Sequence, residues 1–126
     1  MPEPRKTTTA HVLVVGDNED AADMLAQVLT AYGHRVDIAH DGPEALTWLE
    51  QSIPDAALLD IGLPVVDGYE LAQAVRARRP SVKLVALTGY GQADDRAKSR
   101  AAGFDAHLDK PVTIANVTRT LEELLD

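Results

Sequence analysis

The strongest indication of the fold is the segment Ala56-Ala57-Leu58-Leu59-Asp60-Ile61-Gly62-Leu63-Pro64, where a short apolar run ends at a carboxylate. The four apolar residues have the length of a buried β-strand, and the Gly and Pro that follow Asp60 indicate a turn that cannot continue the strand. We therefore expect the Asp60 carboxylate to lie at the rim of a buried sheet.

Three other apolar runs also lead to a polar residue. They cover residues 11–16, 84–87 and 106–109, and they are followed by Asp17, Thr88 and Lys110. Short apolar runs that alternate with helical patterns and are bounded by Gly, Pro and Asp indicate parallel strands buried on both faces. Ligands of such open sheets bind beyond the carboxyl ends of the strands, at a topological switch point. We therefore expect two acids, a hydroxyl and an ammonium around one point.

Helical patterns separate the strands. Asn18-Glu19-Asp20 supplies acceptors for the start of a first helix, Asp41-Gly42-Pro43 opens a second, and the turn through Asp67-Gly68 leads to a third. A fourth helix is expected over 93–102, with Gly103 as its cap. At helical spacing, the inward faces are predicted to carry Leu25, Val28, Leu29 and Tyr32 in the first helix and Ile114, Val117, Leu121, Leu124 and Leu125 in the last.

Two more strands complete the pattern, one at 36–39 and the last at about 105–108. The chain should thus contain five β-α units. We predict an α/β fold, a (βα)5 doubly wound arrangement around a five-stranded parallel sheet.

The length of 126 residues suits one domain with one core. Residues 1–9 have Pro, Thr and charge without periodicity, so we predict a disordered leader followed by a domain over 10–126. Cysteine is absent, which excludes disulfides and thiolate metal sites. The apolar stretches are far shorter than the roughly 20 residues that a membrane helix needs, and the first residues lack the core of a signal peptide. We expect a soluble, cytoplasmic chain without membrane insertion.

The formal net charge is −8, from 12 Lys and Arg against 20 Asp and Glu. Such a charge would repel a phosphate backbone, so direct binding of nucleic acid is not expected. Arg76, Arg78 and Arg79 form one basic cluster, which we interpret as cations favoured at a helix C-terminus.

Four motifs follow one another along these β-α units. They are Leu-Asp-Ile-Gly-Leu-Pro at 59–64, Asp-Gly-Tyr-Glu at 67–70, Ala-Leu-Thr-Gly-Tyr-Gly at 86–91 and the pair Lys110-Pro111. In this order they resemble the receiver domain of two-component response regulators, and more closely the receivers attached to hybrid histidine kinases. The resemblance covers residues 11–125. It implies the flavodoxin-like strand order 2-1-3-4-5.

The resemblance also implies a role for each strand-end residue. Asp60 would be the phosphoacceptor, and Mg²⁺ would be bound by Asp17, Asp60 and the backbone carbonyl of Gly62. Thr88 would hydrogen-bond the phosphoryl group and act as a switch, and Lys110 would pair with the phosphoryl group. An aspartyl phosphate does require a carboxylate nucleophile, a divalent ion and fixed donors for the charge. Mg²⁺ prefers one or two carboxylates together with phosphate and water.

The resemblance also implies that the Lys110-Pro111 bond is a cis peptide. Bonds that precede proline are the ones that readily adopt the cis form. Two positions depart from the family pattern. Gly16 stands where the family usually has the first of two adjacent acids, which removes a carboxylate that would reach the metal. His107 occupies the place of the usual Tyr or Phe that turns inward on activation; a His there is either a packed or solvated side chain or a smaller, titratable switch.

A domain of this kind could serve three functions. The first is a phosphorelay module that takes phosphoryl from a histidine kinase or a histidine phosphotransfer domain onto Asp60 and switches a surface read by a downstream protein. It would catalyse only its own phosphorylation and dephosphorylation and would not be an enzyme acting on a metabolite. The second is a pseudo-receiver, which binds partners without phosphorylation because Gly16 weakens the metal site. The third, a flavodoxin-like enzyme or nucleotide binder, is disfavoured because no Gly-rich phosphate loop follows the first strand.

Overall fold

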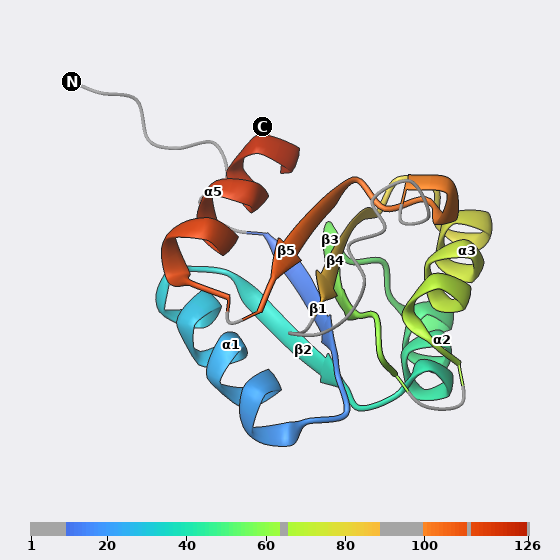
Figure 1. Cartoon of the computed structure of the whole chain (residues 1–126), viewed down its shortest axis with the longest axis horizontal. Coiled ribbons are helices and arrows are strands. Elements are labelled where there is room, and N and C mark those ends of the chain that lie inside the picture. The colour runs from blue at the N-terminus through green and yellow to red at the C-terminus, as the bar shows by residue number, and fades with distance from the viewer. Residues whose placement is uncertain (1–9, 64–65, 89–99, 111, 126) are drawn as a thin grey trace.

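A computed structural model of the chain describes residues 10–63, 66–88, 100–110 and 112–125. Its centre is a parallel sheet of five strands (Figure 1). The strands are β1 (His11–Val15), β2 (Arg35–Ala39), β3 (Ala56–Asp60), β4 (Lys83–Thr88) and β5 (Ala106–Asp109). Their order is β2-β1-β3-β4-β5, and every neighbouring pair is parallel. The predicted fold class and strand order are therefore confirmed.

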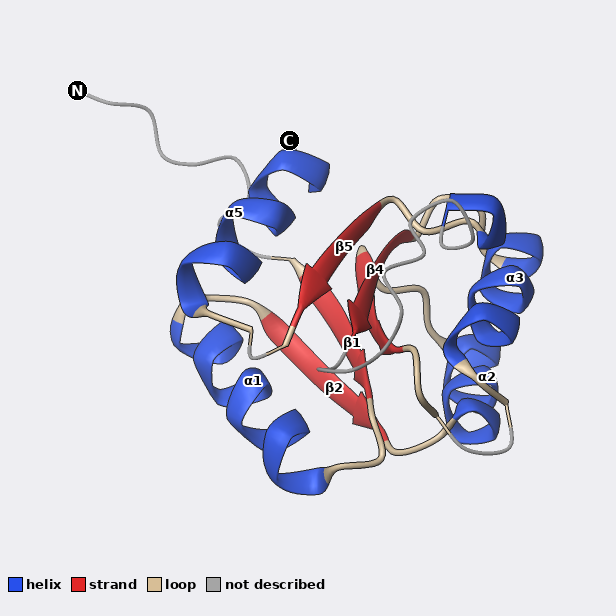
Figure 2. Cartoon of the chain, viewed as in Figure 1, coloured by secondary structure: helices blue, strands red, loops and turns tan. Residues whose placement is uncertain are grey.

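Helices cover both faces of the sheet, which makes three layers (Figure 2). The helices are α1 (Glu19–Ala31), α2 (Gly42–Gln51), α3 (Gly68–Arg78) and α5 (Ile114–Leu125). α1 and α5 lie on one side, and α2 and α3 lie on the other. Of the helix predicted at 93–102, only residues 100–102 are described, and they are helical. Gly103 follows with φ of 108°, the left-handed conformation of a helix cap.

The predicted leader at 1–9 and the predicted cis bond to Pro111 lie outside the described residues. Within the described part of the chain, no helix is both long and apolar enough to cross a bilayer.

Alternate residues of each central strand face the two helical layers. In β1, Leu13 and Val15 pack into the cluster that includes α2 and α3, whereas Val12 and Val14 pack toward α1 and α5. Both sides are buried, which is the pattern expected of a parallel sheet covered on both faces.

The prediction of which residues of α1 and α5 face inward is wrong at two positions. Leu29, Val117 and Leu121 are buried as predicted. However, Tyr32 is 56% exposed and Ile114 is 47% exposed. Tyr32 is the C-cap residue of α1, and Ile114 is the first residue of α5, so both lie at a helix end and not in the middle of a packed face.

Arg76 joins three separated segments rather than lying free at the end of α3. Its guanidinium donates to the carbonyls of Pro80, Val82 and Gly103 and to the Asp105 carboxylate at 2.9 Å. The same carboxylate oxygen accepts the backbone N–H of Leu84. Arg76 thus ties α3 to the starts of β4 and β5, a structural role that the sequence interpretation of the basic cluster did not include.

The start of α3 packs tightly against the end of β3. Asp67 caps the helix, and a capping box joins Asp67 and Glu70. A Cβ placed on Gly68 would lie 2.7 Å from both the Asp60 carbonyl oxygen and the Ile61 Cα. The Asp-Gly-Tyr-Glu motif therefore has a physical reason: only Gly lets α3 approach the backbone at Asp60 this closely.

This close approach predicts that Gly68→Ala destabilises the fold by about 1–3 kcal/mol, the usual cost of forcing an added carbon into a packed site. The clash must outweigh the helix-propensity gain of up to about 1 kcal/mol that Ala offers. The matched control is Gly16→Ala, because a Cβ there would meet only the Asp60 Cβ, at 4.0 Å. Urea unfolding measures both variants, and equal free energies of unfolding would contradict the steric explanation.

Candidate functional site

The predicted site residues lie at the carboxyl edge of the sheet. Asp60 is the last residue of β3, and Thr88 is the last residue of β4. Lys110 directly follows β5, and Asp17 comes two residues after the end of β1. Because β1 and β3 are neighbours, as are β3 and β4, these strand ends converge on Asp60 from both sides.

The Asp60 carboxylate is held by two donors. Its Oδ2 accepts a hydrogen bond from the Lys110 ammonium at 2.7 Å, and its Oδ1 accepts the backbone N–H of Gly62 at 3.0 Å. The Asp60 side chain is 13% exposed and that of Lys110 is 36% exposed. The carboxylate is therefore oriented by two hydrogen bonds, one of them from a charged donor, while part of it still reaches solvent.

The Lys110 side chain reaches Asp60 because β5 ends beside β4. The backbone N–H of Lys110 donates to the Thr88 carbonyl at 2.7 Å, which continues the pairing of Thr88 with Asp109. Asp109 and Lys110 are consecutive residues, and their side chains bond different partners. Asp109 accepts a hydrogen bond from Thr88, and Lys110 donates one to Asp60.

Thr88 is buried, and its hydroxyl is bonded toward β5. Its Oγ1 donates to Asp109 Oδ1 at 3.0 Å and lies 3.0 Å from Nε2 of His107. The His107 side chain is 7% exposed, so it is a packed and not a solvated side chain. Sequence reasoning placed His107 near the switch, but it did not predict a direct bond to Thr88.

The expected metal ligands consist only of oxygen donors. Asp17 and Gly62 are exposed, and Asp60 is accessible at the same edge. The described residues contain no cluster of three or more His, Cys, Asp or Glu that could hold a metal ion. The Cβ position of Gly16, 4.0 Å from the Asp60 Cβ, lies next to the carboxylate. An acid at residue 16 would thus lie beside Asp60. With Gly at this position, the site has one carboxylate fewer than it would have with an acid.

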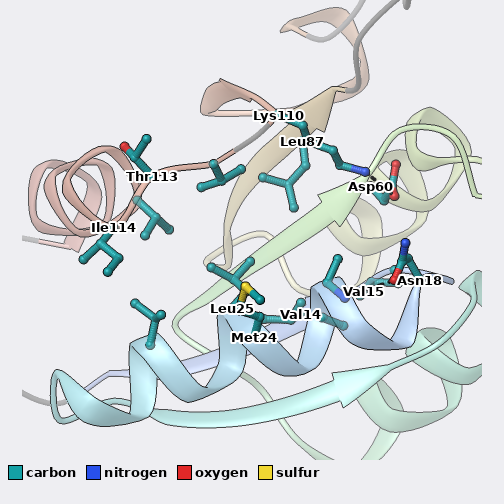
Figure 3. A pocket seen from close by; sticks show the side chains of 16 residues that line it. Val14, Val15, Asn18, Met24, Leu25, Asp60, Leu87, Lys110, Thr113 and Ile114 are labelled. Carbon is teal, nitrogen blue, oxygen red and sulfur yellow. Dashed lines mark hydrogen bonds and ion pairs between the residues drawn. The ribbon is translucent and has the colours of Figure 1, made fainter.

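A groove leads away from this site between α1 and α5. Its volume is about 420 Å³, and Asp60 and Lys110 lie at one end of it (Figure 3). Leu25, Met24 and Ile114 are among its lining residues, and the Met24 side chain is 68% exposed. An apolar surface therefore adjoins Asp60 on the side of α1 and α5. This groove was not predicted from the sequence, where the one available signal was the large apolar side chain of Met24 next to Leu25, outside the predicted inward face of α1.

Comparisons with known proteins agree with this arrangement. The chain matches the family model of the response regulator receiver domain over residues 12–122. It is 37% identical over 118 residues to the transcriptional regulatory protein PrrA of Mycobacterium tuberculosis, which covers 94% of this chain and 51% of PrrA. This chain thus spans about half the length of that relative.

Two solved structures have the same fold. A response regulator receiver domain protein (CheY-like) from Methanospirillum hungatei is 34% identical with a TM-score of 0.87, covering 92% of this chain and 93% of that one. The chemotaxis protein CheY4 of Vibrio cholerae is 28% identical with a TM-score of 0.86, covering 93% and 99%.

Proposed function

Because this chain belongs to the response regulator receiver domain family of two-component systems, whose members are phosphoacceptors, we propose that Asp60 accepts a phosphoryl group from a phosphohistidine. The donor would be a histidine kinase or a histidine phosphotransfer domain. The observation that carries the proposal is the Asp60 carboxylate at the end of β3, paired with the Lys110 ammonium at 2.7 Å.

The proposed transfer forms one bond and breaks one. An Asp60 carboxylate oxygen attacks the phosphorus, an O–P bond forms, and the N–P bond of the phosphohistidine breaks with its electron pair left on the imidazole nitrogen. The product is an acyl phosphate. Lys110 already lies on Asp60, so it can pair with the added phosphoryl oxygens, and the Gly62 N–H keeps the carboxylate oriented during attack.

We further propose that Asp17, Asp60 and the carbonyl of Gly62 hold Mg²⁺, because all three offer the oxygen ligands that this ion prefers. Mg²⁺ bound there would neutralise negative charge on the transferring phosphoryl group. Thr88 would then serve as the donor that reports the phosphoryl group by changing its hydrogen-bond partner.

One observation favours a second function, a pseudo-receiver that binds partners without phosphorylation. Gly16 stands beside Asp60 and supplies no carboxylate, so the negative charge available to a metal ion is smaller. Charge alone does not decide between the two functions, because three protein oxygens and water still suffice for an octahedral ion.

The role of this chain in a signalling pathway depends on the proteins that it binds and on the domains to which it is attached. A closer likeness to receivers of hybrid histidine kinases stays a prediction, since the mycobacterial relative is a transcriptional regulatory protein of about twice the length. A downstream protein that reads the phosphorylated surface is likewise part of the proposal.

The phosphoacceptor proposal predicts that incubation with acetyl phosphate and Mg²⁺ adds the mass of one phosphoryl group and that Asp60→Asn abolishes this gain. The matched control is Asp41→Asn, because Asp41 caps α2 and Asn is an equally good cap. Intact-mass spectrometry measures all three proteins. A phosphoryl adduct that persists in Asp60→Asn would rule out Asp60, and no adduct on the natural chain under any Mg²⁺ concentration would favour the pseudo-receiver.

The metal proposal predicts that Gly16→Asp tightens Mg²⁺ binding by about tenfold, the effect typical of an outer-shell partner. The added carboxylate would also crowd Asp60, so the metal-free variant should unfold more easily than the natural chain. Gly16→Asn is the control that adds the same shape without the charge. Isothermal titration calorimetry measures the affinity, and equal values in the natural chain and Gly16→Asp would mean that Gly16 is only a turn residue.

A further inference from the structure

The hydrogen-bonding capacity of the Thr88 hydroxyl is committed to β5. A hydroxyl has one proton to donate, and a carboxylate can only accept, so the Thr88 proton belongs to the 3.0 Å bond with Asp109 Oδ1. The 3.0 Å contact with His107 must then be donated by Nε2–H of the imidazole to the Thr88 oxygen. Thr88 therefore has no proton left to offer a group on Asp60.

The other nitrogen of His107 agrees with this proton assignment. Nδ1 is buried and has no hydrogen-bond partner among the described residues. A buried N–H without an acceptor is unfavourable, so a proton on Nε2, which has the Thr88 oxygen as its acceptor, suits the site better than a proton on Nδ1. The ring is oriented by the Thr88 bond and by burial of the His107 side chain, which is 7% exposed.

We propose that His107 is a positioning residue that acts through Thr88: together with Asp109 it forms a hydrogen-bonded latch that holds the Thr88 hydroxyl toward β5 until a phosphoryl group on Asp60 competes for it. This inference rests on the proposed function of Asp60 and Thr88. It assigns a specific bond to a position where Tyr or Phe, the residues expected there from the resemblance, would have no ring N–H to offer.

Opening the latch requires an exchange of partners. If Thr88 turns its proton to a phosphoryl oxygen, Asp109 loses a donor and the His107 Nε2–H loses its acceptor. A buried N–H left in this way is unfavourable. His107 has a second acceptor close by, since its Nε2 lies 3.7 Å from Asp109 Oδ1. That distance exceeds a hydrogen bond by well under an ångström, so a small ring movement lets His107 bind Asp109 when Thr88 leaves.

The exchange links the phosphoryl site to β5. Asp109 ends β5 and Lys110 follows it, so the residue that receives His107 in the second state is next to the residue that pairs with Asp60. A shift of the His107 ring therefore reaches the strand that leads into α5.

The test compares beryllofluoride affinity, measured by ¹⁹F NMR with Mg²⁺ present, in the natural chain and in two His107 variants. His107→Phe keeps a ring but removes the N–H that holds the Thr88 oxygen toward β5, so beryllofluoride should bind about two- to tenfold more tightly, the range expected for one net hydrogen bond. His107→Gln restores a side-chain N–H and should return the affinity toward that of the natural chain.

A double-mutant cycle separates the latch from a packing effect. In a Thr88→Val background the latch is already absent, so adding His107→Phe should change the beryllofluoride affinity by less than about twofold. The same gain with and without Thr88, or no gain from His107→Phe, would overturn the latch while leaving binding at Asp60 intact. If the natural chain binds no beryllofluoride, the proposed function of Asp60 fails and the latch fails with it.

NMR of the natural chain provides a measurement that does not depend on any variant folding. Long-range ¹H–¹⁵N spectra should show the Nε2–H tautomer of His107 in the free protein, with a slowly exchanging Nε2–H proton that shifts when beryllofluoride is added. An Nδ1–H tautomer, or a proton that exchanges as freely as that of the exposed His40, would contradict the latch.

Discussion

The pairing of Asp60 with Lys110 is the interaction on which the rest of the site depends. The two residues are 50 positions apart, and their 2.7 Å contact requires β3 and β5 to end at the same edge with β4 between them. A parallel sheet satisfies this requirement, because all its carboxyl ends point in one direction. Gly68 adds a second constraint, since α3 can start directly against the Asp60 backbone only without a Cβ.

The end of β5 connects two environments. Lys110 bonds the carboxylate of Asp60, whereas Asp109 bonds the buried hydroxyl of Thr88. Chemistry at Asp60 and rearrangement around Thr88 therefore share one short piece of backbone. His107 adds a hydrogen bond to this piece, since its Nε2 lies 3.0 Å from the Thr88 hydroxyl oxygen. In the proposed latch, a phosphoryl group on Asp60 would favour a second set of these bonds and so shift the population between two conformations.

The fold was predictable from the sequence because strand ends and turns are local signals. The apolar run ending at Asp60 and the turn after it predicted β3 to the residue, and the alternation of strands with helical patterns predicted the three layers. The contacts of Arg76 were not predictable in this way. They join α3 to residues near 80–82 and 103–105, and sequence spacing carries no information on which distant carbonyls a guanidinium will meet.

The residues of the candidate site were predictable from the sequence, but their hydrogen bonds were not. Residue types at strand ends predicted that Asp60, Thr88 and Lys110 would converge, and the resemblance to receivers supplied their roles. The direction of the Thr88 hydroxyl was not predictable, since it depends on whether His107 points inward and which ring nitrogen faces the strand. The exposed Met24 and the groove beside it were missed because helical periodicity identifies the buried face and not the gap between two helices.

If the convergence of strand ends makes Asp60 the phosphoacceptor, the phosphoryl group can be located directly on this residue. The natural chain would be incubated with acetyl phosphate and Mg²⁺, the acyl phosphate reduced with borohydride, and the modified residue identified by tandem mass spectrometry of its peptides. We expect reduction at Asp60 alone. Modification at Asp17, at Asp109 or at an acid outside the carboxyl edge of the sheet would contradict the account.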